Sequence, residues 1–218
     1  VKRGVTEMVT PGVALGDNIL STKSNNFLAS VYFEKDSYGL AFIDISTGEF
    51  LIAEGNSAYA EKMMQALSPS EVLYPKSKQK DFIQQFGSKF YGFKLDEWVY
   101  SYDNSLETLL KLFETNSLKG FGIEDERLSV IAAGAAIQYL KDTEHHNLAH
   151  LSKISKLTDE RFVWLDRFTV RNLELIYSPH QGGKTLLDVL DRTTSPMGGR
   201  LLKRWLVMPL LDRQKITE

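Results

Sequence analysis

The sequence predicts an α/β domain, in which helices flank a mixed sheet, followed by a shorter segment that is entirely helical. Two observations support this prediction. Up to about residue 141, stretches rich in aromatic and branched residues come first as a group of three and then alternate with stretches of helical periodicity. From residue 166 onward, the apolar residues recur at the spacings of three and four that are typical of helices.

Five stretches have the composition of strands. The first three are separated by tight turns, which favours an antiparallel meander. The fourth is bracketed by Pro69 and Pro75, and we expect it to be buried. In chain order, the predicted strands are Phe27–Phe33, Gly39–Ile45, Glu49–Ala53, Glu71–Tyr74 and Lys89–Leu95.

Four helices are predicted in the same part of the chain, and Asn56 or Ser57 is suited to cap the first. The fourth is almost wholly small and apolar, so we expect it to be buried, with Gly134 allowing a neighbour to come close. Further on, one helix begins at Asp166 or Thr169 and a short one covers residues 186–190. The first four helices are Ala58–Leu67, Gln79–Phe86, about Asn104–Glu114, and Leu128–Lys141.

The most clearly marked helix follows Ser195. Ser195 is suited to cap it, Pro196 to take its first position, and Pro209 to end it. We expect an apolar stripe on one side and basic residues in water on the other. Because nine residues follow Pro209, the stripe must pack on the preceding segment or on sequence absent from this chain. The stripe contains Leu201, Leu202, Trp205, Leu206 and Met208, and the basic side contains Arg200, Lys203 and Arg204.

Composition and charge exclude several classes of protein. No run approaches the roughly 18 consecutive apolar residues of a membrane span, and no apolar signal segment opens the chain. The absence of cysteine excludes disulfides and cysteine-ligated metals. The net charge of −2 lacks the strong basic excess of an autonomous DNA-binding domain. Because the chain starts at Val1 rather than Met and stops at Glu218 without a turn signal, we expect it to be a piece of a longer protein.

Two short patterns suggest chemistry that their surroundings do not support. Residues 182–185, Gly-Gly-Lys-Thr, resemble the end of a phosphate-binding loop, but the first glycine of that motif would fall at Ser178, after a predicted helix rather than a strand. We interpret them as a loop between helices. His146 and His150 have the spacing of metal ligands on a helix, but with His145 they lie in a polar stretch that is typical of a linker.

Four groups of residues, in one order along the chain, resemble the MutS family of DNA mismatch-recognition ATPases. Val9–Gly12 resembles the start of the connector domain of that family, and Gly120–Glu124 together with Ala132–Thr143 resembles its last part. Asp166–Leu175 resembles the first helix of the core domain, and Asp191–Leu206 resembles the start of the core (lever) domain. The resemblance covers nearly the whole chain.

This resemblance implies an RNase H-like connector domain over residues 1–147 and the N-terminal part of the core domain over residues 148–218. A three-stranded meander followed by alternating helices and strands is also RNase H-like topology, so the predicted elements agree with the motifs. The resemblance implies no catalytic, cofactor or metal residue in this piece. ATP, Mg²⁺ and the mismatch-wedging motif belong to other domains of the parent.

The same resemblance implies a role in DNA mismatch repair in the bacterial cytoplasm. The intact protein would bind mismatched DNA, form a homodimer and recruit MutL. The region implicated in MutL contact corresponds to the helix around 104–113, whose polar face offers Asn104, Glu107, Thr108 and Lys111. An ordinary helix surface is the alternative interpretation. Residues 143–158 are a plausible hinge between the two domains.

Two other functions stay open at this point. A MutS paralogue that acts in recombination would carry the same two domains. An RNase H-like nuclease would need acidic residues on the first strand, the first helix and the fourth strand. The first predicted strand contains none, and Asp44, between Ile43 and Ile45, is expected to face solvent. The basic side of the last helix, with Arg200, Lys203 and Arg204, is a weak candidate for contact with a DNA backbone.

Overall fold

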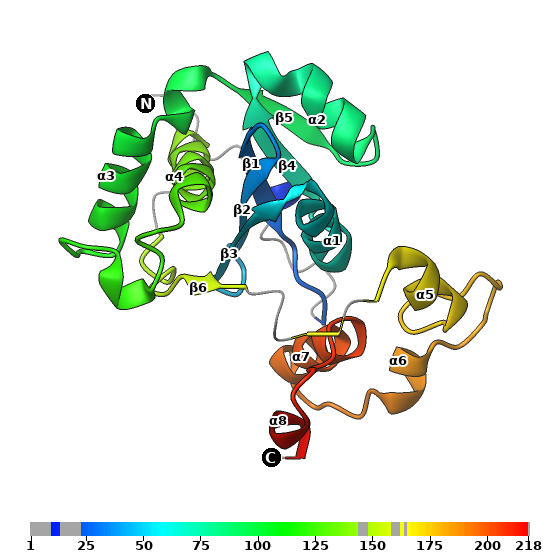
Figure 1. The fold of residues 1–218 in the computed structure, drawn as a ribbon. Helices are drawn as coiled ribbons and strands as arrows, with labels where there is room; N and C mark the ends of the chain where they lie inside the picture. The colour runs from blue at the N-terminus through cyan, green and yellow to red at the C-terminus, as the bar shows by residue number, and fades with distance from the viewer. Residues whose placement is uncertain (1–9, 14–22, 144–147, 158–161, 164, 218) are drawn as a thin grey trace, which may run out of the picture.

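The computed structural model describes residues 10–13, 23–143, 148–157, 162, 163 and 165–217. These residues form two parts: an α/β domain and a smaller helical part that follows it. Figure 1 shows α3 and α4 on one face of the sheet, α1 and α2 on the other, and the helices α5 to α8 grouped together beyond the sheet. The predicted fold class, a mixed sheet with flanking helices and a helical region, is confirmed at this level.

The sheet contains the five predicted strands and one that was not predicted. Its order is β5-β4-β1-β2-β3-β6. The first three strands form the predicted antiparallel meander, while β1 pairs in parallel with β4, β4 with β5, and β3 with β6. The strands are β1 Leu28–Glu34, β2 Ser37–Asp44, β3 Glu49–Asn56, β4 Glu71–Pro75, β5 Gly92–Leu95 and β6 Ser155–Lys156.

The four helices of the domain lie where the sequence predicts them. Asn56 caps the first, since its side-chain oxygen accepts a hydrogen bond of 2.9 Å from the backbone N–H of Tyr59. Short 3₁₀ turns cover residues 11–13, 76–78, 97–100 and 119–121. The helices are α1 Ser57–Leu67, α2 Gln79–Phe86, α3 Tyr102–Leu112 and α4 Arg127–Asp142.

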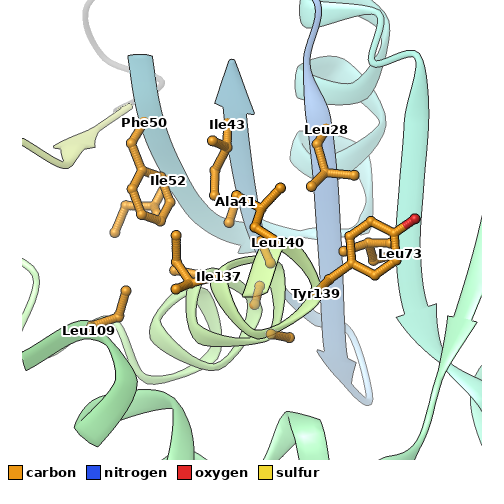
Figure 2. Packing of buried hydrophobic residues seen from close by; sticks show 14 of the residues in the cluster. Leu28, Ala41, Ile43, Phe50, Ile52, Leu73, Leu109, Ile137, Tyr139 and Leu140 are labelled. Atoms are coloured by element: carbon orange, nitrogen blue, oxygen red, sulfur yellow. The ribbon is translucent and has the colours of Figure 1, made fainter. Parts of the chain in front are cut away.

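The first core lies between the sheet and the pair α3 and α4. Figure 2 shows Ile137 and Leu140 of α4 pointing at the sheet, with Leu109 of α3 on the outer side. The two helices come close at Gly134, where an added Cβ would lie only 2.3 Å from the Cβ of Ser105. The predicted burial of α4 and the role of Gly134 are therefore confirmed. The facing sheet residues include Leu28, Ala41, Ile43, Phe50, Ile52 and Leu73.

The second core lies on the α1 and α2 face of the sheet, and the helical part joins it. Val170 and Leu175, from the region of α5, and Val207 and Met208, from the end of α7, belong to the same cluster as the side chains of α1 and α2. Burial of apolar surface in one shared cluster stabilises the docking of the helical part on the domain.

The helical part contains the three predicted helices and one more. Asp166 caps α5, and its carboxylate accepts a hydrogen bond of 2.6 Å from the N–H of Thr169. Ser195 caps α7 through the N–H of Gly198 at 3.1 Å, with a proline at the first helical position as predicted. The short α8 was not predicted. The helices are α5 Arg167–Asn172, α6 Leu186–Leu190, α7 Pro196–Val207 and α8 Arg213–Thr217.

The segment that follows α4 packs on the domain rather than on the helical part. Leu148, Leu151 and Ile154 are buried in the first core, and β6 adds two residues to the edge of the sheet next to β3. These contacts lie beyond residue 147, where the sequence placed the end of the domain. Residues 144–147, in the stretch predicted to be a hinge, lie outside the described residues.

Candidate partner-binding surface and the contact between the two parts

Helix α3 turns one face toward α4 and the other toward solvent. Leu109 and Ser105 face α4, and the Ser105 hydroxyl donates a hydrogen bond of 3.2 Å to the carbonyl of Ile131. Glu107 and Lys111 face solvent and form an ion pair of 2.5 Å, with about two thirds of each side chain exposed at 66% and 69%. The Lys111 hydrogen bond lowers the pKa of Glu107.

The other two residues predicted for this surface are less accessible. Thr108 is only 6% exposed, so the expectation that it lies on the outer face of the helix is wrong. Thr108 follows Ser105 by three positions, so it lies on the same side of the helix as Ser105, which contacts α4. Asn104 is half-buried, and its amide nitrogen is buried with no hydrogen-bond partner among the described residues. The exposed part of the candidate surface therefore consists of Glu107 and Lys111, with Asn104 beside them.

The basic side of α7 faces the α/β domain, which is opposite to the expectation. The guanidinium nitrogens of Arg204 contact both carboxylate oxygens of Glu49 on β3, at 2.6 and 2.7 Å. The ammonium of Lys203 donates to the hydroxyl of Ser24 at 3.3 Å, and burial lowers its pKa. Arg200 is half-buried and lines a small cavity of about 80 Å³ with these two residues.

The predicted apolar stripe of α7 is only partly covered, since Leu202 and Leu206 are half-buried. Leu201 is 44% and Trp205 56% exposed, whereas Met208 is buried against the domain. Periodicity predicts that a helix has an apolar and a basic side, but it does not say which neighbour each side meets. Here Glu49 supplies a bidentate partner for Arg204, and that contact turns the basic side inward.

Residues 23–26 form an extended strip between the two parts. Lys23 donates to the carboxylate of Asp191 at 2.7 Å and to the carbonyl of Thr193 at 3.2 Å. An added Cβ at Gly199 of α7 would lie 2.8 Å from the aliphatic chain of Lys23, so this glycine allows the close approach. The side chain of Asn25 donates to Glu49 at 3.1 Å. The strip therefore connects the sheet to α7 through polar contacts.

Two carboxylates are completely buried in the α/β domain, and both are held by hydrogen bonds. Asp44 was expected to face solvent, which is wrong: it accepts from the side chain of Asn25, from the backbone N–H of Asn26, and from the N–H and hydroxyl of Ser46. These donors, supplied by the strip and by the turn after β2, offset the cost of burying the charge.

Glu71 is a buried carboxylate that the sequence does not point to. It begins β4 and accepts hydrogen bonds from the hydroxyl of Thr10 at 2.5 Å, the N–H of Gly12 at 3.0 Å and the hydroxyl of Tyr139 at 2.8 Å. The signal that could have found it is the pair of a buried-strand acid and the Thr-Pro-Gly turn at residues 10–12. The contacts fasten residues 10–12 to β4 and α4.

A cleft of about 640 Å³ separates α1 and α2 from the segment around α5. It continues into the small cavity beside Arg200, because both share several lining residues. Its lining contains both apolar and polar side chains. The apolar lining includes Met64, Phe86, Phe90, Leu165, Ile176 and Val207.

The two patterns considered for chemistry have structural roles where they are described. Thr185 caps α6 in a capping box with Asp188, and Gly182 has a left-handed φ of 76° in the loop before it. His150 makes a hydrogen bond of 2.8 Å with the carbonyl of Ile45, while His145 and His146 lie outside the described residues. In the part of the chain that the structure describes, no group of three His, Asp or Glu residues is arranged to hold a metal ion.

The fold and these contacts define a protein in which an α/β domain is joined to a helical part through polar contacts and a shared apolar cluster. Comparison with known proteins gives the family. The family model described as MutS domain II matches residues 26–152, and that of MutS domain III matches residues 168–218. The chain belongs to the MutS family.

Relatives from several bacteria match the chain over almost all of its length. The DNA mismatch repair protein MutS of Flavobacterium johnsoniae is 54% identical over 99% of this chain and 25% of its own length. The protein of the same description from Phocaeicola vulgatus is 55% identical over 100% of this chain and 25% of its own, and that from Cytophaga hutchinsonii is 49% identical over 100% and 26%. The chain thus spans about a quarter of the length of these relatives. None of the helices described here is long and apolar enough to cross a membrane.

Proposed function

We propose that this chain is the connector and the first part of the core domain of a bacterial, cytoplasmic, ATP-dependent mismatch repair protein, and that it transmits conformational state between other domains. The observation that carries this proposal is the polar contact between the two parts. A relay needs an element with two discrete arrangements, and an ionic contact beside a cleft of about 640 Å³ is easier to rearrange than a close-packed core. ATP, Mg²⁺, mismatched DNA and the homodimer contact belong to the rest of the intact protein.

The arrangement of the strands supports an RNase H-like fold for the first domain. An antiparallel meander is followed by β4 and β5, which are added in parallel on the β1 side. We also propose that this domain extends beyond residue 147. Leu148, Leu151 and Ile154 are buried in its core and β6 pairs with β3, so the boundary falls after Lys156.

The outer face of α3 is the proposed docking surface for MutL. Glu107 and Lys111 are its accessible charged residues, and their ion pair presents both signs of charge within one turn of helix. Arg204 is held by Glu49 and Lys203 is half-buried, so a role of the basic side of α7 in DNA contact would require the two parts to separate. We therefore place partner binding on α3 rather than on α7.

Titration of the chain against MutL tests the docking role. The double variant Glu107→Lys with Lys111→Glu reverses the charges but keeps an ion pair four residues apart, so the helix is retained while the surface is inverted. We expect the variant to lose binding to MutL. The control is Lys80→Asp with Asp81→Lys on α2, which exchanges charges on the other face of the sheet and should leave binding unchanged. Equal binding by all three proteins would rule out docking on this face.

The names of the relatives favour mismatch repair over recombination for the intact protein. The nuclease alternative gains no support from the described residues. Asp44 and Glu71 are each surrounded by hydrogen-bond donors of the chain itself, and this arrangement is typical of structural carboxylates. A Mg²⁺-dependent cleavage assay with single-stranded and duplex DNA would overturn this view if it showed activity that Asp44→Asn abolished.

A further inference from the structure

The contact between the two parts has an ionic centre. Glu49 and Arg204 meet through a hydrogen bond of 2.7 Å from Nη2 to Oε2 and an ion-pair contact of 2.6 Å between Nη1 and Oε1, and about three quarters of each side chain is buried, with 24% and 26% exposed. Two such contacts between a guanidinium and a carboxylate are more directional than one, and the exposed quarter of each side chain leaves the pair open to screening by salt. This pair joins β3 of the domain to α7 of the helical part.

Glu49 is held in place from the side of its own domain. The side chain of Asn25 donates to Glu49 at 3.1 Å and also to the buried Asp44 at 2.8 Å. Asp44 in turn is fixed by the backbone of Asn26 and by Ser46. The carboxylate of Glu49 is therefore preorganised before α7 arrives, and little side-chain freedom remains to be lost when Arg204 binds it.

The apolar contact between the parts is incomplete. Val170, Leu175, Val207 and Met208 reach the cluster on the α1 and α2 face, but beside them the cleft of about 640 Å³ remains open. Protein interiors are close-packed, and a gap removes the dispersion contacts that would otherwise lock two surfaces together. The orientation of the helical part therefore depends on the ionic contact more than it would across a filled interface.

We propose that Glu49 and Arg204 form a releasable ionic clasp that sets the orientation of the helical part on the α/β domain. While the clasp is closed, α7 lies across the end of the sheet where β3 begins, as Figure 1 shows. When it opens, the helical part moves relative to α2. The clasp gives the relay proposed above a specific contact, but it requires neither MutL nor ATP. A failure of docking on α3 would leave it intact, and the reverse also holds.

Distance measurement between two spin labels tests the clasp directly. The chain contains no cysteine, so Lys80→Cys on α2 and Leu201→Cys on α7 give unique and exposed labelling sites. Pulsed electron–electron double resonance then measures the distance between the labels in four proteins. These are the labelled protein without further change, the same protein with Glu49→Arg, with Arg204→Glu, and with both exchanges together. Circular dichroism of each variant confirms that its helices are formed.

We expect one dominant distance in the background protein. In each single variant, the population of other distances relative to the dominant one should rise by about tenfold. The double exchange should restore most of the original distance distribution. The control is Lys119→Glu, which breaks the exposed ion pair between Lys119 and Glu124 and should leave the distances unchanged. Unchanged distances in both single variants would overturn the proposal, as would a double exchange that behaves like the singles.

Salt provides a second measurement that needs no change at Glu49 or Arg204, and it decides the question if those variants fail to fold. Raising the sodium chloride concentration from about 0.05 M to about 1 M shortens the screening length to about 3 Å. The labelled background protein should then populate the additional distances, while a temperature series at constant low salt gives the reference. A distribution that is indifferent to salt would contradict a clasp held by charge.

Discussion

The α/β domain and the helical part differ in how far they bury their apolar residues. In the domain, nearly every residue of α4 is buried between the sheet and α3. In the helical part, α7 has a similar share of large apolar residues, yet Met197, Leu201 and Trp205 are exposed. The N-cap residue of α4, Glu126, makes no side-chain capping hydrogen bond, whereas Ser195 caps α7, so the difference in burial lies in their neighbours. The domain encloses its own core, whereas the outer stripe of α7 has no cover among the described residues.

This difference separates local from tertiary contributions to structure. The cap at Ser195 and the proline that follows it favour the helix α7 wherever it lies, because they act on its own backbone. The burial of α4 depends on partners that come from several strands of the sheet and from α3. We therefore expect the stability of the domain to be sensitive to single side chains, and that of the helical part to depend on the contact with the domain.

The largest expected effect is the difference in stability between a substitution in α4 and one in α7. Ile137→Ala removes a fully buried side chain from α4 and should lower the free energy of unfolding by about 2–5 kcal/mol, because it leaves a cavity in a close-packed core. Leu201→Ala removes an exposed side chain from α7 and should change the free energy of unfolding by about 0.5 kcal/mol or less. Urea denaturation followed by circular dichroism measures both. Similar costs would mean that α7 is as enclosed as α4.

A smaller effect is expected where the domain buries a charge rather than an apolar group. Tyr139→Phe removes one of the three donors to Glu71 while the shape of the side chain is kept. Because a buried carboxylate then lacks a hydrogen bond, the free energy of unfolding should fall by about 1–2 kcal/mol. The control is Tyr102→Phe at a half-buried position on α3. If both changes cost the same, the hydroxyl of Tyr139 has no special role.

The local features of both parts were predictable from the sequence. The five strands, the four helices of the domain and the caps at Asn56 and Ser195 follow from periodicity and from residues within a few positions of each other. The family also followed from short motifs. By contrast, β6 has two residues, too few for a periodic pattern, and the five residues of α8 include a single large apolar one, Ile216.

The errors concern contacts between residues far apart in the chain. Asp44 is buried because donors from Asn25 and Asn26 reach it, and nothing beside it in the sequence announces them. Arg204 faces inward because Glu49, 155 positions away, supplies its partner. Thr108 was placed on the outer face from helical spacing alone, although only 6% of it is exposed. The proposed docking residues on α3 stay a prediction.

A modest effect is expected in the contact between the parts when the pH is lowered. The hydrogen bond from Lys23, followed by those from Thr193, lowers the pKa of Asp191 to about 2, from an ordinary value of 3.8. A carboxyl with a lowered pKa stabilises the folded state above its unfolded pKa, and this contribution is lost as the pH falls from about 4 to 2. Carbon-13 NMR of the Asp191 carboxyl measures the titration. Lys23→Met should raise the pKa toward 3.8, and an unchanged value would exclude Lys23 as the main cause.

The smallest effect on stability is expected for the exposed ion pair of Glu107 and Lys111 on α3, because neither residue is part of a core. The Lys111 hydrogen bond lowers the pKa of Glu107, so Lys111→Met should return that pKa toward 4.5. Stability should hardly change, because Glu107 is exposed and water replaces the lost contact. The melting temperature should move by less than about 2 °C. A loss of MutL binding in this variant without a loss of stability would mean that the pair has been retained for recognition. A marked drop in melting temperature would instead show that α3 needs the pair for its own structure, and charge reversal would then no longer report on docking alone.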